Sequence, residues 1–285
     1  MRLRKTGRSL LDKYFVELLF SKPLSRNRVL FSTNNDWATP IKRNIDFIKY
    51  FPVFESFEHA HLDQYSLVIP LSLPDTYYLN KNHAELNGEK FLIPSNRAID
   101  ICKDKVAFNN YLCDTGYQNY IPNISGEQKF PYVLKKRVSE FGENIFYIKN
   151  ASDEHKYQSK LSSDEYFKQA YIGGRKEYTT HILIKNKKII FQKTLEFDFN
   201  DEFYIKGKYY KRMSWKKLET PPFINDFLLI LNNLDYEGIC CFNYKIHDKQ
   251  IKLFEINPRY GGSLTQFLKE LMVAYAESMN SDRIK

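Results

Sequence analysis

Apolar and polar positions alternate in a short segment near the end of the chain. Residues 251–254 follow the period-two pattern of a β-strand. Pro258 then interrupts any ladder of hydrogen bonds, so we expect the strand to end there in an irregular loop. Glu255, Asn257 and Arg259 are spaced by two, which places their side chains on one face of the strand end.

The rest of the chain predicts an alternation of strands and helices. Strands are expected at residues 28–32, 65–73, 130–135, 145–149, 178–184, 189–193 and 238–246. Helices are expected at residues 8–20, 41–50, 95–112, 163–168, 223–234 and 264–279. Because strands that alternate with helices usually form a parallel sheet, we expect one in the opening segment. The pattern therefore predicts an α/β (α+β) fold class.

The helix expected at residues 8–20 is amphipathic and has basic residues before it. Contact with a membrane surface or with a partner would fit this pattern. We favour docking on its own domain, or on a second copy in a homodimer. Charged residues interrupt its apolar patch, which argues against a signal peptide.

Composition and charge narrow the class of protein. With 285 residues, of which 43% are hydrophobic, the chain can bury a sizeable core. Its four cysteines form no Cys-x-x-Cys pair, which favours reduced thiols in a cytoplasmic protein. No apolar run approaches the roughly 20 residues that span a bilayer, so we expect no transmembrane segment. The net charge of +9 suits an anionic ligand, but the scattered lysines argue against nucleic acid as a partner.

The polar residues at the expected strand end have the chemistry of a metal and phosphate site. Glu255 and Asn257 offer hard oxygen ligands of the kind that Mg²⁺ binds. Arg259 offers a planar fork for phosphate. The glycines at 261 and 262 let backbone N–H groups approach an anion closely. A solvated strand face followed by a turn is the alternative interpretation.

Residues 255–263 read Glu-Ile-Asn-Pro-Arg-Tyr-Gly-Gly-Ser, and this segment resembles the metal-and-phosphate strand of the ATP-grasp superfamily. The similarity is to its carbamoyl-phosphate-synthase-like and carboxylate–amine ligase branches. The resemblance implies an ATP-grasp fold with an N-terminal α/β pre-ATP-grasp domain at residues 1–94. The ATP-grasp domain then comprises residues 95–285, with a small lid subdomain at about 115–172 and a C-terminal catalytic subdomain.

Two further segments resemble parts of these enzymes that contact nucleotide phosphates. Asp104-Lys105 resembles the segment that leads into the lid, and the resemblance implies that Lys105 reaches phosphate. Lys135 ends an expected strand and is followed by a flap with one glycine, Gly142. The resemblance implies that Lys135 and this flap clamp the polyphosphate, although Lys136 stands where proline is usual in the family.

The segment Gln169-Ala170-Tyr171-Ile172 resembles the hinge that offers backbone groups to adenine in these proteins. Gln169 replaces a commoner glutamate. The resemblance implies that Glu177 bonds the ribose, although it lies one residue further along than is usual.

Asn243 lies 12 residues before Glu255, across an expected hairpin, so antiparallel pairing would bring the two together. In related enzymes an acidic residue or glutamine at this position binds the first Mg²⁺. The resemblance thus implies a metal site of Asn243, Glu255 and Asn257 that holds two ions, with Glu255 bridging them. Asparagine is a weaker, neutral ligand.

The function implied by the resemblance is ATP- and Mg²⁺-dependent ligation. A substrate carboxylate becomes an acyl phosphate and is then joined to an amine, so the partners are ATP and small-molecule carboxylate and amine substrates. Arg259, Lys135, Glu255 and Asn257 would be the catalytic residues, acting by charge neutralisation and positioning. An ATP-grasp phosphotransferase and a catalytically weakened nucleotide-binding protein are the alternatives.

Two features leave their interpretation open. Residues 194–221 are rich in aromatic residues and lysine, which fits either an insertion over the active site or an ordinary hairpin. Lys193 ends an expected hairpin, where a cation could meet the transferred phosphoryl group or simply be solvated.

Overall fold

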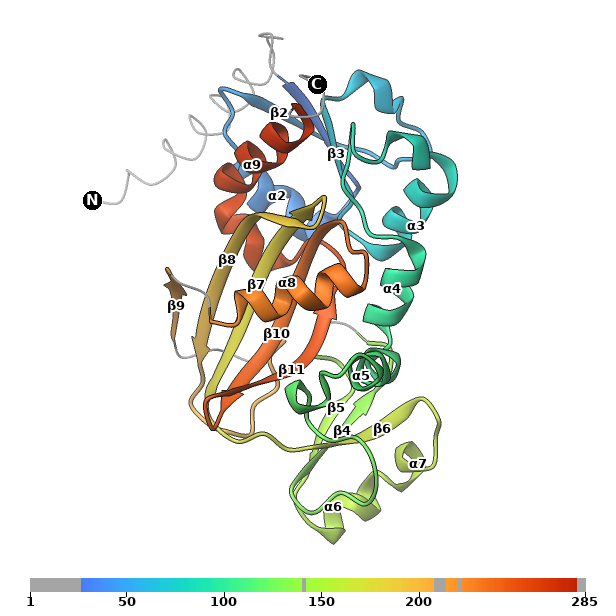
Figure 1. Ribbon diagram of the computed structural model, residues 1–285, viewed down its shortest axis with the longest axis vertical. Coiled ribbons are helices and arrows are strands. Elements are labelled where there is room, and N and C mark those ends of the chain that lie inside the picture. The colour runs from blue at the N-terminus through green and yellow to red at the C-terminus, as the bar shows by residue number, and fades with distance from the viewer. Residues whose placement is uncertain (1–26, 140–141, 208–213, 220–221, 281–285) are drawn as a thin grey trace, which may run out of the picture.

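The computed structural model describes residues 27–139, 142–207, 214–219 and 222–280. These residues form three sheets that follow one another along the longest axis of the molecule (Figure 1). The helix expected at residues 8–20 lies outside the described residues. Within the described part of the chain, no helix combines the length and the apolar character needed to cross a membrane.

The first sheet is parallel, as expected, with the order β2-β1-β3. It comprises β1 (Asn27–Phe31), β2 (Tyr50–Phe54) and β3 (Leu67–Ile69), with helices α2 (Asn35–Asn44) and α3 (Leu73–Asn82). The helix expected at residues 41–50 is misplaced. Asn34 starts it earlier, because its side chain accepts the free backbone N–H groups of Asp36 and Trp37. It ends at Asn44, and Tyr50, the last residue of the expected helix, instead begins the edge strand β2.

The second sheet is antiparallel, with the order β11-β10-β7-β8-β9. It comprises β7 (Lys176–Lys185), β8 (Lys188–Asp198), β9 (Ser214–Leu218), β10 (Gly238–His247) and β11 (Gln250–Asn257). Helix α8 (Ile224–Asn233) lies in front of this sheet in Figure 1 and buries Phe227 against Phe242 of β10. Helix α9 (Leu268–Asn280) lies between the first and second sheets.

The third sheet is a small antiparallel lid with the order β5-β4-β6. It comprises β4 (Tyr132–Lys136), β5 (Ile145–Ile148) and β6 (Tyr166–Ala170), with the short helices α6 (Ala151–Lys156) and α7 (Gln158–Leu161). The helix expected at residues 163–168 is wrong. Pairing with β4, in which Tyr132 faces Ala170, makes this segment a strand and overrides its local helical pattern.

Two helices join the sheets where a single helix was expected at residues 95–112. They are α4 (Asn96–Lys103) and α5 (Lys105–Asp114). Asp104 separates them, because its carboxylate accepts the backbone N–H groups of Val106 and Ala107 and so begins a new helix. The same carboxylate pairs with Arg137 at 2.7 Å. This arrangement fixes the first turn of α5, and with it Lys105, beside the lid.

The first sheet and the C-terminal helix share one core. Val29 and Phe31 of β1 lie in the same buried cluster as Leu268 and Met272 of α9. The backbone N–H of Leu92 also donates to the hydroxyl of Tyr275 at 2.6 Å. Residues from both sides of position 94 therefore share one core, and the domain division at residues 94 and 95 stays a prediction.

Candidate functional site

A cavity of about 870 Å³ lies between the second sheet and the lid. Its walls come from β7, β10 and β11 on one side and from β4, β5 and the end of β6 on the other. Every site residue predicted from the sequence lines it: Lys105, Lys135, Gly142, Gln169, Ala170, Tyr171, Ile172, Glu177, Asn243, Glu255, Asn257 and Arg259. The fold thus gathers residues from five separate segments, although their roles stay predictions.

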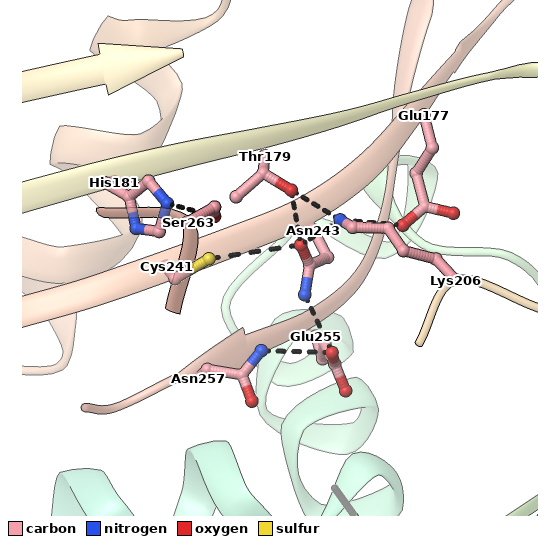
Figure 2. Close-up of polar contacts among 9 residues, drawn as sticks. All are labelled: Glu177, Thr179, His181, Lys206, Cys241, Asn243, Glu255, Asn257 and Ser263. Atoms are coloured by element: carbon pink, nitrogen blue, oxygen red, sulfur yellow. Dashed lines mark hydrogen bonds and ion pairs between the residues drawn. The ribbon is translucent and has the colours of Figure 1, made fainter. Parts of the chain in front are cut away.

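The predicted pairing of Asn243 with Glu255 is confirmed. The two residues are register partners in β10 and β11, and the Asn243 side chain donates Nδ2–H to Glu255 Oε1 at 2.8 Å. Asn257 donates Nδ2–H to the same oxygen at 3.0 Å (Figure 2). The carboxylate is therefore held by two amides whose positions are set by the strand ladder.

The environment of Glu255 keeps it ionised. Burial alone raises the pKa of its carboxyl group, but the Lys105 ammonium and the two amide donors outweigh burial and lower the pKa to about 2. Lys105 Nζ lies 3.5 Å from Glu255 Oε2. Lys105 is itself buried and also donates to the Ser139 carbonyl at 3.1 Å. Glu255 is thus an anion with one oxygen bound by amides and the other facing a buried cation.

Lys135 enters the cavity from β4 of the lid. Burial lowers the pKa of its ammonium to about 8, even though the charge of Glu255 acts in the opposite direction. Its Nζ lies 4.7 Å from the centre of the Phe254 ring. The buried ammonium is poorly solvated in the free protein, so an anionic ligand would gain by pairing with it.

The hinge at the end of β6 has a polar group without a partner. The Nε2 of Gln169 is buried and makes no hydrogen bond to any described residue. Lys245 of β10 holds the other side of the hinge, donating to the carbonyl oxygens of Ile172 at 2.9 Å and Gly174 at 2.6 Å. Burial lowers the pKa of Lys245 to about 8, although the negative charges of Glu177 and Glu202 act to raise it. The sequence reasoning missed Lys245, although its position two residues after Asn243 on the same strand face was a usable signal.

Lys206 is the second cation that the sequence reasoning missed. It belongs to residues 199–207, which follow β8 and which we call the strap. Four of these residues line the cavity: Tyr204, Ile205, Lys206 and Gly207. Its Nζ contacts Thr179 Oγ1, donates to Asn243 Oδ1 at 2.7 Å and lies 3.0 Å from Glu177 Oε1. The composition of residues 194–221 pointed to this region, but no spacing singled out this lysine.

The far end of the cavity contains further residues that were not predicted. His181 and Ser263 share a hydrogen bond of 2.8 Å between Nε2 and Oγ. Burial lowers the pKa of His181 to about 3, with a smaller effect from Lys206, so the imidazole is neutral at neutral pH. A Cβ on Gly261 would lie 2.7 Å from His181 Cε1, which explains why glycine stands there. The Trp37 ring lies 5.8 Å from the Arg259 guanidinium.

Lys193, the other cation considered from the sequence, does not line the cavity. Its ammonium pairs with Glu270 of α9. Lys206, rather than Lys193, is therefore the cation that the region after β7 brings to the site.

No protein-family model and no curated protein matches the chain in sequence. Solved structures do match. D-alanine–D-alanine ligase from Bacillus anthracis superposes with a TM-score of 0.60 at 13% identity, covering 90% of this chain and 98% of that one. Its complex with ATP gives a TM-score of 0.58 at 14% identity, covering 90% and 97%.

Two other enzymes are similar. N5-carboxyaminoimidazole synthetase from Staphylococcus aureus, complexed with ADP, gives a TM-score of 0.61 at 13% identity and covers 88% of this chain and 77% of that one. L-amino acid ligase from Bacillus licheniformis gives 0.56 at 12% identity, covering 85% and 68%. The chain therefore has the ATP-grasp fold that the resemblance of residues 255–263 implied.

Proposed function

We propose that this protein is an ATP-dependent ligase that activates a carboxylate as an acyl phosphate and joins it to an amine. The observation that carries the proposal is the convergence of Lys105, Lys135, Glu255 and Arg259 in one cavity. Lys105 comes from α5 and Lys135 from β4 of the lid. Glu255 comes from β11 of the second sheet, and Arg259 from the loop after it. Similarity in fold to ligases that bind ATP or ADP supports the same reaction class.

The hinge end of the cavity suits the nucleotide base. Gln169 Nε2 is a buried donor for which the described residues supply no acceptor. The backbone of residues 170–172 lies beside it, held by Lys245. A cavity of about 870 Å³ is within the range of small-molecule sites and has room for a nucleotide. We assign this end to adenine and ribose.

The strand end suits one magnesium ion. Within the described residues, no group of three His, Cys, Asp or Glu side chains could hold a metal by itself. Mg²⁺, however, commonly binds through one or two carboxylates together with substrate phosphates. Glu255 supplies the carboxylate, and Asn257, whose Nδ2 faces Glu255, has its Oδ1 left to serve as a ligand. The ion would neutralise phosphate charge as the γ-phosphoryl group is transferred.

The remaining residues of the site position the substrates and neutralise phosphate charge. Lys105 and Lys135 neutralise the phosphates, and the fork of Arg259 holds the γ-phosphoryl group and then the acyl phosphate. Ser263, whose hydroxyl is oriented by His181, lies in the loop that docks the substrate. The amine then attacks the acyl carbon, and phosphate leaves. We place this reaction in the cytoplasm, where ATP is available.

The test is ADP release from Mg²⁺-ATP with pools of small carboxylates and amines. We expect release to require one carboxylate–amine pair and to disappear in Glu255→Ala. Glu219→Ala is the matched control, because Glu219 is exposed and pairs only with Lys217 among the described residues. ADP release that persists in Glu255→Ala would contradict the assignment.

One observation favours a second candidate, a nucleotide-binding protein with weakened catalysis. Asn243 is neutral, so this site has less charge with which to hold metal than the related enzymes that use an acidic residue here. This candidate predicts that ATP binds tightly while no combination of the tested carboxylates and amines leads to ADP release.

A further inference from the structure

The Lys206 ammonium sits in a nest of oxygen atoms inside the cavity. Thr179 Oγ1, Asn243 Oδ1 and Glu177 Oε1 surround its Nζ, the latter two at 2.7 and 3.0 Å (Figure 2). A hydroxyl, an amide oxygen and a carboxylate are the ligand types that a hard divalent ion uses. Here they are grouped around a cation that belongs to the protein.

The orientation of Asn243 matches this arrangement. Its amide oxygen accepts from Lys206, and its amide nitrogen donates to Glu255. A metal ion bound to Asn243 would have to share that oxygen with an ammonium of the same sign. An aspartate at this position would add a negative charge and could not donate to Glu255. Asparagine and Lys206 are therefore compatible with each other, and a second metal ion is not compatible with this pair.

The strap that delivers Lys206 is fixed at several points. The Tyr171 hydroxyl donates to the carbonyl of Glu202 at 3.0 Å, and the Tyr171 ring stacks on Phe203 at 4.9 Å. Gly142 of the flap touches the strap so closely that a Cβ there would lie 2.5 Å from the Lys206 carbonyl oxygen. The hinge and the flap together thus set where the backbone of Lys206 runs.

We infer that the Lys206 ammonium takes the place of one of the two metal ions that the family resemblance implies, so that this chain binds nucleotide with a single divalent ion. The inference rests on the proposed function. The remaining ion would be held by Glu255 and Asn257. Lys206 would exchange one of its three oxygen partners for a phosphate oxygen. An ammonium gives one positive charge instead of two, and it needs no metal supply.

The test counts bound metal directly. Mn²⁺ is titrated into the protein saturated with a non-hydrolysable ATP analogue, and the free Mn²⁺ signal is followed by electron paramagnetic resonance. We expect one Mn²⁺ per chain in the wild type. We expect two in Lys206→Met/Asn243→Asp, in which the ammonium is removed and a carboxylate is supplied. Two ions in the wild type, or one in the double variant, would overturn the inference.

A second measurement covers the case in which the double variant does not fold. In metal-free buffer, Lys206→Met alone should weaken binding of the analogue about tenfold, because a charge-assisted hydrogen bond is lost. Lys193→Met, which removes a lysine outside the cavity, should leave binding unchanged. Equal affinity in Lys206→Met and wild type would overturn the inference. If the analogue does not bind the wild type even when Mn²⁺ is present, the proposed function itself fails. That is a different result from binding with two ions.

Discussion

The β10–β11 hairpin and the strap both bring charged side chains into the cavity, but they hold them in different ways. Glu255 is fixed by the register of two paired strands, in which Asn243 stands directly opposite. Lys206 is fixed by a segment outside the strands, held through aromatic contacts and single hydrogen bonds to the lid and hinge. Glu255 is thus part of the rigid sheet, whereas Lys206 belongs to a segment that can separate from the lid and hinge.

The two kinds of support differ in how easily they open. Each contact of the strap, such as the stacking of Phe203 on Tyr171, contributes roughly 1 kcal/mol. Moving Glu255 would require breaking a ladder that includes most of β11 and a buried core. We therefore expect the strap to part from the lid during ligand entry while the hairpin stays in place.

The largest effect is expected from Glu255→Gln, which tests the rigid side of the comparison. The substitution keeps the shape of the side chain but removes the charge that faces Lys105 and that we propose as a metal ligand. ADP release should fall about 100-fold or more, because a preorganised charge is lost at the site of phosphoryl transfer. Circular dichroism should be unchanged. Activity within a few-fold of the wild type would mean that the hairpin does not hold the reacting groups.

The next effect is a pH dependence of nucleotide binding that comes from Lys135. The phosphate contact that we propose for Lys135 needs the protonated ammonium, and the pKa of this group is lowered to about 8. Affinity for the ATP analogue should therefore fall as pH rises above 8, by at most about tenfold per pH unit for one proton. Calorimetric titrations at several pH values measure this fall.

Stability should change in the opposite direction. Below pH 8 the folded protein carries a buried charge that is less favourable than in the unfolded chain, whose lysine has a pKa of 10.5. The contribution of Lys135 to the free energy of unfolding therefore rises between pH 8 and 10.5. Because Lys245 also has a pKa of about 8, Lys135→Met is needed to assign the effect. If nucleotide binding keeps its full pH dependence in Lys135→Met, the dependence comes from another titrating group.

Lys245→Met tests how the hinge end of the cavity is held. It removes the two hydrogen bonds that hold the carbonyl groups of Ile172 and Gly174. Affinity for the ATP analogue should fall about tenfold, because the backbone groups that we propose to contact adenine lose their fixed geometry. Affinity for inorganic tripolyphosphate, which lacks the base, should not change. Equal losses for both ligands would show that Lys245 acts on phosphate instead.

The smallest effect is expected from Phe203→Ala in the strap. The variant loses the stacking on Tyr171 and the contact with Lys149, whose Nζ lies 4.1 Å from the ring centre. Nucleotide affinity should fall only about threefold, while limited proteolysis within the strap should speed up. Unchanged proteolysis would mean that other contacts hold the strap and that it is as rigid as the hairpin.

The same contrast explains what could be predicted from the sequence. Glu255, Asn257 and Arg259 were identified because they stand in a continuous segment whose spacing reports their common face. Lys206 was missed because its position depends on Gly142 and Tyr171, which are distant in sequence. The segment at 163–168 was misjudged for a similar reason, since its pairing with β4 is a tertiary contact.

The core that joins β1 to α9 also has a consequence for how the protein is made. Val29 and Phe31 emerge early from the ribosome, but Leu268 and Met272, which cover them, emerge only after every strand of the described chain. Ile41 and Ile45 can cover part of this apolar face early, but the part that α9 covers stays exposed while nearly all the rest is synthesised. Translation that stops before α9 would release a chain whose early strands lack the C-terminal part of their core.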